Sequence, residues 1–258
     1  MKIITWNMQW NTGCFAQKDQ SENWNYIKGI GADIALLQEC NKKYLEEHCD
    51  TEGDCKFIFK DDKGIVFWRK SYTVPCDKPS WGTAIYVSSK LKDYRIEEVP
   101  ENEYPNDEYK KGKMMIVNVG KLTFASIHVD TTNSKIGLKH LQDIFSHDIL
   151  SKSNLIIGGD FNADRNHDES YPRLNKEFFE PCFDKNDNLI ECNLPEGKQK
   201  TKWFRNELCS WQDDHIYISS TLVNGNAPDA VAHNGDNMKS LSDHTIVEIE
   251  IDEKLLKD

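Results

Sequence analysis

The sequence lacks any run of about 18 apolar residues, the length that a membrane-spanning helix needs. It also opens without the apolar core of roughly 7–15 residues that marks a secretory signal peptide, so we expect a cytoplasmic protein with no membrane span. Its eight cysteines form no Cys-x-x-Cys pair and no zinc-ligand spacing. We expect most of them to be reduced core thiols, with a disulfide within the group Cys40, Cys49 and Cys55 as the alternative.

Basic residues are fewer than acidic ones: the sequence has 32 Lys and Arg residues and 43 Asp and Glu residues, which gives a net charge of −11. This balance argues against a protein that coats nucleic acid or an anionic membrane through its overall charge. An acidic enzyme can still bind a phosphate locally if a metal ion lies in its cleft. Seven Trp, nine Tyr and eleven Phe exclude a disordered composition. No repeat or linker divides the chain, so we expect a single domain over residues 1–258, acting as a monomer.

Strand-like segments rich in β-branched and aromatic residues recur along the chain, and helical patterns separate some of them. Ser21 is predicted to cap a helix that carries Trp24 and Ile27 on one face, Ser134 to cap a second, and residues 171–179 are a third candidate. A sheet with two apolar faces must be covered on both, so we expect an α/β fold of two mixed sheets packed face to face with helices outside. The expected strands are Lys2–Trp6, Ile34–Gln38, Lys56–Phe59, Gly64–Arg69, Thr83–Val87, Met114–Val119, Thr123–His128, Leu155–Gly158, His215–Ser219, Ala230–Ala232 and Thr245–Ile251.

Polar residues suited to chemistry stand at the ends of several apolar strands. If these strands are neighbours, their ends meet at one rim and supply what a divalent metal, a water nucleophile and a phosphoryl group require. Oxygen ligands with few protein contacts suit Mg²⁺. The residues concerned are Asn7, Glu39, His128, Asp160, Asn162, Asp214, Asp243 and His244.

Six short motifs in this order resemble the endonuclease/exonuclease/phosphatase superfamily, the metal-dependent phosphodiesterases related to DNase I and exonuclease III. One of these motifs alone would be a weak signal, whereas six in order are a strong one. The resemblance implies a four-layer α/β sandwich, a hydrolase of phosphate esters that uses Mg²⁺ or Mn²⁺, and an active site at one end of the two sheets. The motifs are T-W-N (5–7), L-Q-E (37–39), H-V-D (128–130), G-D-F-N (159–162), D-H-I (214–216) and S-D-H (242–244).

The resemblance also implies a role for each strand-end residue. Glu39, with Asn7 and Asp243, would bind the metal. Asp160 would orient and deprotonate the attacking water, and Asn162 would hold the same water or a phosphate oxygen. His128 and His244 would donate to phosphate oxygens, with Asp214 accepting the other ring N–H of His244. The sequence leaves open whether the aspartate or the histidine is the base and whether one metal or two act.

The substrate is the least determined part of this interpretation, since one fold serves many substrates. We expect an intracellular nuclease or DNA-repair-type phosphodiesterase that acts on nucleic acid. The alternative is a phosphatase or phosphodiesterase of a small phosphorylated or lipid head group, of inositol phosphate or sphingomyelinase type. Candidate substrate contacts are Arg165, Trp81 and Trp203. Two lysine clusters are interpreted as solvated loops: Lys110, Lys111 and Lys113, and Lys198, Lys200 and Lys202.

Overall fold

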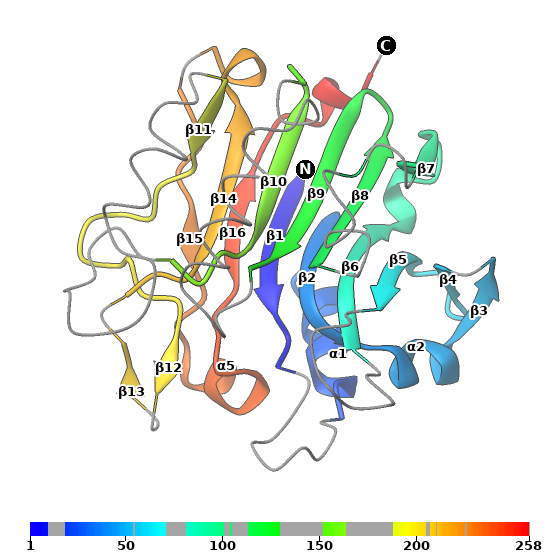
Figure 1. The fold of residues 1–258 in the computed structure, drawn as a ribbon, viewed down its shortest axis with the longest axis horizontal. Coiled ribbons are helices and arrows are strands. Elements are labelled where there is room, and N and C mark those ends of the chain that lie inside the picture. Colours follow the sequence, from blue (N-terminus) through cyan, green and yellow to red (C-terminus); the bar gives the residue numbers. More distant parts are fainter. Residues whose placement is uncertain are drawn as a thin grey trace.

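Two large mixed β-sheets pack face to face and form the centre of the molecule (Figure 1). This confirms the predicted α/β architecture, the four-layer sandwich. The structure is a computed structural model. It describes residues 1–9, 19–53, 55–70, 81–100, 104, 113–129, 152–163, 188–204, 207–209, 211–224 and 226–257.

Within the part of the chain that the structure describes, the larger sheet has eight strands, and its one parallel pairing joins β1 (Lys2–Asn7) and β2 (Ile34–Asn41), with Ile3 opposite Ile34. Along its central strands, successive side chains point to opposite faces of the sheet, as the two-residue period of a β-strand requires. In order across the sheet the strands are β15 (Val231–Ala232), β16 (Val247–Glu250), β1, β2, β6 (Trp81–Ser88), β5 (Gly64–Lys70), β4 (Lys56–Phe59) and β3 (Cys49–Glu52).

The second sheet has six strands, again with one parallel pair, in which Asp160 lies opposite His128. The order is β11 (Leu189–Glu191), β14 (Asp214–Ser219), β10 (Leu155–Asp160), β9 (Leu122–His128), β8 (Met114–Val119) and β7 (Ile96–Glu98). A separate short hairpin pairs β12 (Trp203–Phe204) with β13 (Glu207–Leu208).

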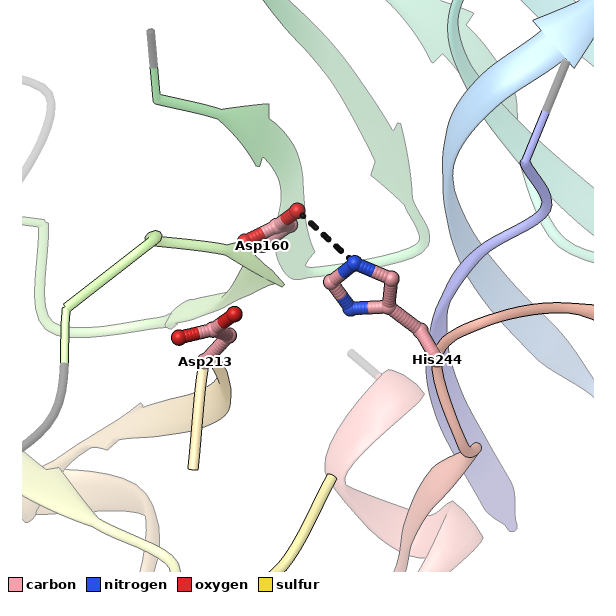
Figure 2. Close-up of side chains that lie close together, drawn as sticks. All are labelled: Asp160, Asp213 and His244. Atoms are coloured by element: carbon pink, nitrogen blue, oxygen red, sulfur yellow. Dashed lines mark ion pairs between the residues drawn. The ribbon is translucent and has the colours of Figure 1, made fainter. Parts of the chain in front are cut away.

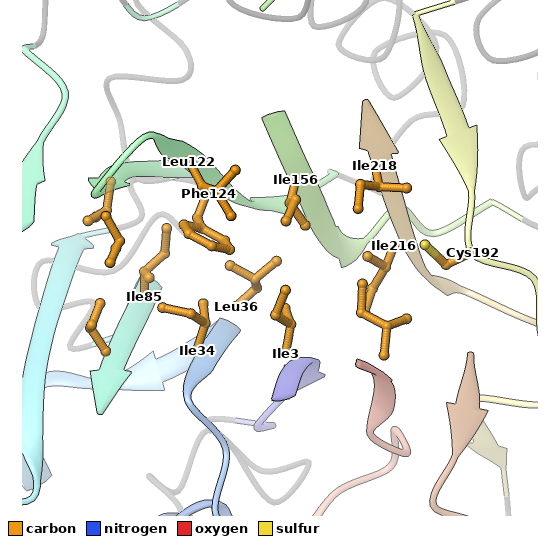
Figure 3. Packing of buried hydrophobic residues seen from close by; sticks show 14 of the residues in the cluster. Ile3, Ile34, Leu36, Ile85, Leu122, Phe124, Ile156, Cys192, Ile216 and Ile218 are labelled. Carbon is orange, nitrogen blue, oxygen red and sulfur yellow. The ribbon is translucent and has the colours of Figure 1, made fainter. Parts of the chain in front are cut away.

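The apolar core lies in layers on both sides of each sheet. Between the sheets, Ile3 and Leu36 of the larger sheet pack against Phe124, Ile156 and Ile216 of the smaller one (Figure 3). Residues of opposite parity on the same strands belong to the outer layers, each with its own buried apolar cluster. The helices that cover the outer face of the larger sheet are α1 (Ser21–Gly29), α2 (Lys42–His48) and α5 (Asp236–Leu241). Three 3₁₀ turns span Ser89–Leu91, Ser220–Leu222 and Glu253–Leu256.

Most predicted strands are present within one or two residues of their expected bounds, and Lys56–Phe59 and Met114–Val119 match fully. Sequence reasoning missed the short strands β3, β7, β11, β12 and β13 and the helices α2 and α5. The prediction that Ser21 caps α1 is wrong, because Gln20 occupies the cap position and Ser21 bonds back to the Asp19 carboxylate. The helix expected after Ser134 and the candidate at 171–179 lie outside the described residues.

The described cysteines are free thiols, and no disulfide joins Cys40, Cys49 and Cys55. Cys40, Cys49 and Cys192 are buried, as expected for core thiols, while Cys55 and Cys209 are partly exposed. Among the described residues, none of the helices combines the length and apolar character needed to cross a membrane.

Candidate active site

Four strand ends meet at one edge of the two packed sheets. β1 ends at Asn7 and β2 carries Glu39 in the larger sheet, while β9 ends at His128 and β10 at Asp160 in the smaller one. Both strand pairs are parallel, so each pair places its carboxyl-terminal residues at the same edge. The sequence prediction that these residues share a rim is therefore confirmed by their contacts.

Asp160 is the centre of this group. Its Oδ2 accepts a hydrogen bond from Nδ2 of Asn7 at 3.0 Å, and the same nitrogen lies 3.1 Å from Oε1 of Glu39. Nε2 of His128 lies 3.8 Å from Oδ2 of Asp160 and 3.9 Å from Oε1 of Glu39. Nε2 of His244 lies 3.5 Å from the same Asp160 oxygen. One buried carboxylate oxygen therefore faces groups from both sheets.

Glu39 sits at a β-bulge. The pairing of β2 with β6 shifts between Leu37 and Cys40, and Glu39 adopts a left-handed backbone conformation with φ of 52°. A bulge re-aims a side chain and leaves part of the ladder unpaired, and positive φ is costly for a residue with a Cβ. The backbone at Glu39 therefore needs support from outside the sheet.

Gln20, which is fully buried, gives that support. Its Nε2 donates to the carbonyl of Glu39 at 2.8 Å and to the carbonyl of Met8 at 3.2 Å, and its Oε1 accepts the N–H of Asn41 at 2.7 Å. One side-chain amide thus satisfies backbone groups on both sides of the bulge and joins them to the segment that follows β1. Sequence reasoning gave this residue no role.

His244 and Asp214 form a buried pair that spans the two sheets. Nδ1 of His244 lies 2.9 Å from Oδ2 of Asp214 at the first position of β14. The ring is fixed from its backbone side as well, because Trp6 Nε1 donates to the His244 carbonyl and the Ser242 hydroxyl accepts the His244 N–H. The same Ser242 hydroxyl donates to the Asn7 carbonyl at 2.6 Å. The predicted Asp214–His244 contact is therefore present.

Two further charged residues, Lys202 and Asp213, join the site although the sequence did not indicate them. Nζ of Lys202 lies 2.6 Å from Nε2 of His244 and 3.5 Å from Oδ2 of Asp243, and its side chain is only 15% exposed. The expectation that Lys202 belongs to a solvated loop is wrong, and Lys113 of the other cluster is also buried. Asp213 could have been predicted as a site residue because it stands beside Asp214, directly before an apolar strand.

The remaining predicted residues are placed as follows. Asn162 donates its Nδ2 to the Val129 carbonyl and its backbone N–H to Asp160. The Trp81 ring is buried, with its centroid 5.7 Å from that of His128. The backbone N–H of Trp203 donates to the Asp243 carbonyl, and Lys239 lies over the Trp203 ring. Asp243 points its carboxylate toward Lys202 and is 38% exposed, and Arg165 lies outside the described residues.

The charges around Asp160 lower the pKa of this carboxyl group. Burial alone would raise its pKa, but His244, His128 and Lys202, together with the Asn7 hydrogen bond, outweigh burial and lower it to about 2. Asp160 is therefore ionised at neutral pH.

The pKa values of His244 and Asp214 shift in the opposite direction, upward. Burial would lower the pKa of His244, but the carboxylates of Asp214 and Asp160 outweigh burial and the nearby Lys202 and raise it to about 9. Burial, with the like charges of Asp160 and Asp213, raises the pKa of Asp214. The site thus concentrates cationic hydrogen-bond donors next to carboxylates held out of water.

The donor set fits a hard divalent cation. Asp160, Asp213 and His244 each bring one ligand atom within 4.8 Å of the others, and all three are buried. Figure 2 shows the two carboxylates side by side, both facing the imidazole ring. Glu39 joins the group through the Asn7 amide. Clustered carboxylate oxygens are the ligands that Mg²⁺ and Mn²⁺ prefer.

The chain belongs to the Endonuclease/Exonuclease/phosphatase family, whose model matches residues 4–244. Members of this family are hydrolases that act on phosphate esters. No curated protein sequence matches the chain at a significant level.

Several solved structures share the fold over almost their whole length. An AP endonuclease from Archaeoglobus fulgidus matches 98% of this chain and 99% of its own, with a TM-score of 0.63 and 13% identity. TDP2 from D. rerio, complexed with single-strand DNA product, matches 96% and 97%, with a TM-score of 0.62 and 14% identity. The 3′ phosphatase NExo from Neisseria, bound to product DNA hairpin, matches 98% and 99%, with a TM-score of 0.62 and 15% identity. At these identities the likeness shows the fold.

The role of Gln20 is testable by Gln20→Leu, which keeps the volume and removes three hydrogen bonds. Unsatisfied buried groups cost about 1–3 kcal/mol each, so we expect a lower melting temperature, and we expect weaker Mn²⁺ binding by calorimetry because Glu39 loses its fixed backbone. Asn23→Leu is the matched control, since its amide bonds the Met8 and Leu241 carbonyls and does not touch Glu39. Equal Mn²⁺ affinity in the two variants would contradict the assignment.

The raised pKa of His244 predicts a specific pH dependence of stability in metal-free protein. Because the folded-state pKa is about 9 against an ordinary 6.5, the stabilisation from the protonated ring is complete below pH 6.5 and is lost as pH rises through about 9. We expect the difference in unfolding free energy between wild type and His244→Gln to shrink over that interval in urea titrations. An NMR titration that places this pKa at or below 6.5 would disprove the expectation.

Proposed function

We propose that this protein is a metal-dependent phosphodiesterase, a nuclease or DNA-repair-type enzyme that hydrolyses phosphate ester bonds in nucleic acid with Mg²⁺ or Mn²⁺. The observation that supports this most directly is the position of Asp160, a buried and ionised carboxylate that faces Asn7, His128 and His244. Family membership supports hydrolysis of a phosphate ester as the reaction class.

In this proposal Asp160 orients the attacking water and accepts its proton as the new bond to phosphorus forms. A buried carboxylate that is already ionised can accept a hydrogen bond from water without first losing a proton. Asn162 follows Asp160 by two residues, and its backbone N–H donates to Oδ1 of Asp160, which fixes the aspartate rotamer. A fixed aspartate rotamer supports attack by water from one direction in this proposal.

His244 supplies a hydrogen bond to a non-bridging phosphate oxygen as negative charge develops there. Its Nδ1 faces Asp214, and its Nε2 lies 3.5 Å from Oδ2 of Asp160 and 2.6 Å from Nζ of Lys202, a contact that a bound phosphate oxygen would replace. His128 reaches the same region from β9 and supplies a second donor. Donors fixed before the reaction stabilise a developing charge without a cost of reorganisation.

The metal ion would be held by Glu39 and Asp160, with Asp213 and Asp243 as further oxygen donors and Asn7 aligning the first two. When bound, it neutralises charge on the phosphate and promotes ionisation of water.

A second candidate function is hydrolysis of a small phosphorylated or lipid head group. The net charge of −11 favours it, because an acidic protein repels a long polyanion more than a small phosphate ester. Assays of the purified protein with Mg²⁺ on single-stranded DNA, double-stranded DNA, RNA and phosphoinositides decide between the two. We expect cleavage of a nucleic acid and little release of phosphate from inositol lipids.

Metal dependence gives the first prediction from this proposal. EDTA should abolish hydrolysis, and Mg²⁺ or Mn²⁺ should restore it. Glu39→Gln should raise the Mg²⁺ concentration needed for half-maximal rate while the melting temperature stays within a few degrees of wild type. Full activity after exhaustive chelation would refute the metal assignment, and a large loss of melting temperature would instead indicate a structural role for Glu39.

The second prediction concerns Asp160 as the proton acceptor and the coupling of Asp214 with His244. Asp160→Asn should lower turnover by the roughly 10²–10⁴-fold typical of a lost proton acceptor, with substrate binding retained. Asp214→Asn and His244→Ala should each lower turnover, and the double variant should be little worse than His244→Ala alone, because residues that act as a unit are not additive. Single-turnover rates in which the two losses multiply would disprove the coupling, and near-wild-type turnover of Asp160→Asn would overturn the mechanism.

A further inference from the structure

Lys202 lies in the site, but it does not belong to any of the strands whose ends carry Asn7, Glu39, His128 and Asp160. It precedes the β12–β13 hairpin, and its Nζ is 2.6 Å from Nε2 of His244, the atom proposed above to donate to the phosphate. Its Nζ also lies 3.5 Å from Oδ2 of Asp243, whose side chain is the more exposed of the two. The lysine is therefore directed at the position where substrate would bind.

The backbone around Lys202 is fixed on three sides. The buried hydroxyl of Thr201 accepts the N–H groups of Asp213 and Asp214, and the Thr201 carbonyl accepts the N–H of Thr245. The carbonyl of Lys202 itself accepts a hydrogen bond from the backbone N–H of Cys209. The backbone that carries this lysine is therefore fixed, and its side chain is only 15% exposed, so ligand binding costs less conformational entropy here than at a lysine on a free loop.

The contact between Lys202 and His244 brings two donor groups to one place. An ammonium group has only donors, and a protonated imidazole ring also has only donors. Their 2.6 Å separation leaves no room for an atom between them, so a phosphate oxygen would bind beside the two nitrogens, accept from both and replace their direct contact. A phosphate oxygen at hydrogen-bonding distance from Nε2 of His244 would also lie within reach of Nζ. A lysine ammonium is a compact point charge, and its attraction grows with the charge on the ligand.

We propose that Lys202 is a substrate-binding residue whose ammonium group binds a non-bridging oxygen of the scissile phosphate and shifts the selectivity of the site toward terminal phosphate monoesters. A monoester carries close to two negative charges at pH 8 and an internal diester carries one, so the same cation binds the monoester more strongly. This inference rests on the proposed function, because it assigns the phosphate to the site built around Asp160.

The test uses two stable ligands that differ in charge. Methyl phosphate and dimethyl phosphate are titrated at pH 8 with Mg²⁺ into wild type, Lys202→Met and Lys202→Arg, and binding is followed by ³¹P NMR. Hydrogen bonds to charged groups are worth roughly tenfold to a hundredfold in affinity, so we expect Lys202→Met to lose at least about tenfold for methyl phosphate and clearly less for dimethyl phosphate. Lys202→Arg should recover most of the loss.

Lys198→Met is the matched control, because it removes an exposed positive charge four residues away. Equal losses for the two ligands in Lys202→Met, or a loss no larger than that of Lys198→Met, would overturn the inference. If Lys202→Met does not fold, Lys202→Gln takes its place, with melting temperature as the check.

Cleavage assays on an oligonucleotide with and without a terminal phosphate separate this inference from the proposed function. If wild type cleaves no nucleic acid but Lys202→Met still loses methyl phosphate affinity selectively, the proposed substrate is wrong and the role of Lys202 stands. If wild type cleaves nucleic acid and the two ligands respond equally, the role of Lys202 is wrong and the proposed function stands.

Discussion

The parallel pairing of β1 with β2 and of β9 with β10 is the constraint on which the site depends. Each pair ends at one edge of its own sheet, and the apolar layer between the sheets brings the two edges together. Gln38 adds a polar link across that layer, because its Nε2 donates to the Ser126 hydroxyl at 3.0 Å, and this hydroxyl donates to the Leu37 carbonyl. A shift of one residue in either pair would turn Asn7 or Asp160 to the opposite face.

The site concentrates charge where burial makes charge expensive. Asp160, Asp213 and Asp214 are almost fully buried, and such carboxylates are stable only when cations and hydrogen-bond donors compensate them. His244, His128 and Lys202 supply part of that compensation, and a divalent cation would supply more. The same buried carboxylates would therefore favour a bound cation.

The sequence predicted the parts of this arrangement that depend on local patterns. The bounds of β4 and β8 match the prediction, since short runs rich in β-branched and aromatic residues are typical of strands. The clustering of Asn7, Glu39 and Asp160 at one edge was predictable, because a polar side chain at the end of a buried strand is costly to bury without polar partners.

What the sequence could not supply depends on contacts between distant segments. Lys202 contacts His244, which lies 42 positions away in the sequence. A lysine in a polar stretch has no local sequence feature that shows whether its side chain is buried against a partner or exposed to solvent. Gln20 acts only because β2 bulges at Glu39, which in turn depends on the pairing with β6. The helix α2 is different, because Asn41 caps it through the N–H of Lys43, a signal that the sequence does contain.

The hydrogen bond between His244 and Asp214 has one end beside each sheet, since His244 precedes β16 and Asp214 begins β14. Its length therefore follows the spacing of the two sheets, and the proton affinity of the imidazole follows its length. The proton affinity of this ring is therefore sensitive to the packing of one sheet on the other. A core substitution far from the rim, such as one at Ile3 or Ile216 in the layer between the sheets, would register as a change in the protonation of this one histidine before any strand is lost.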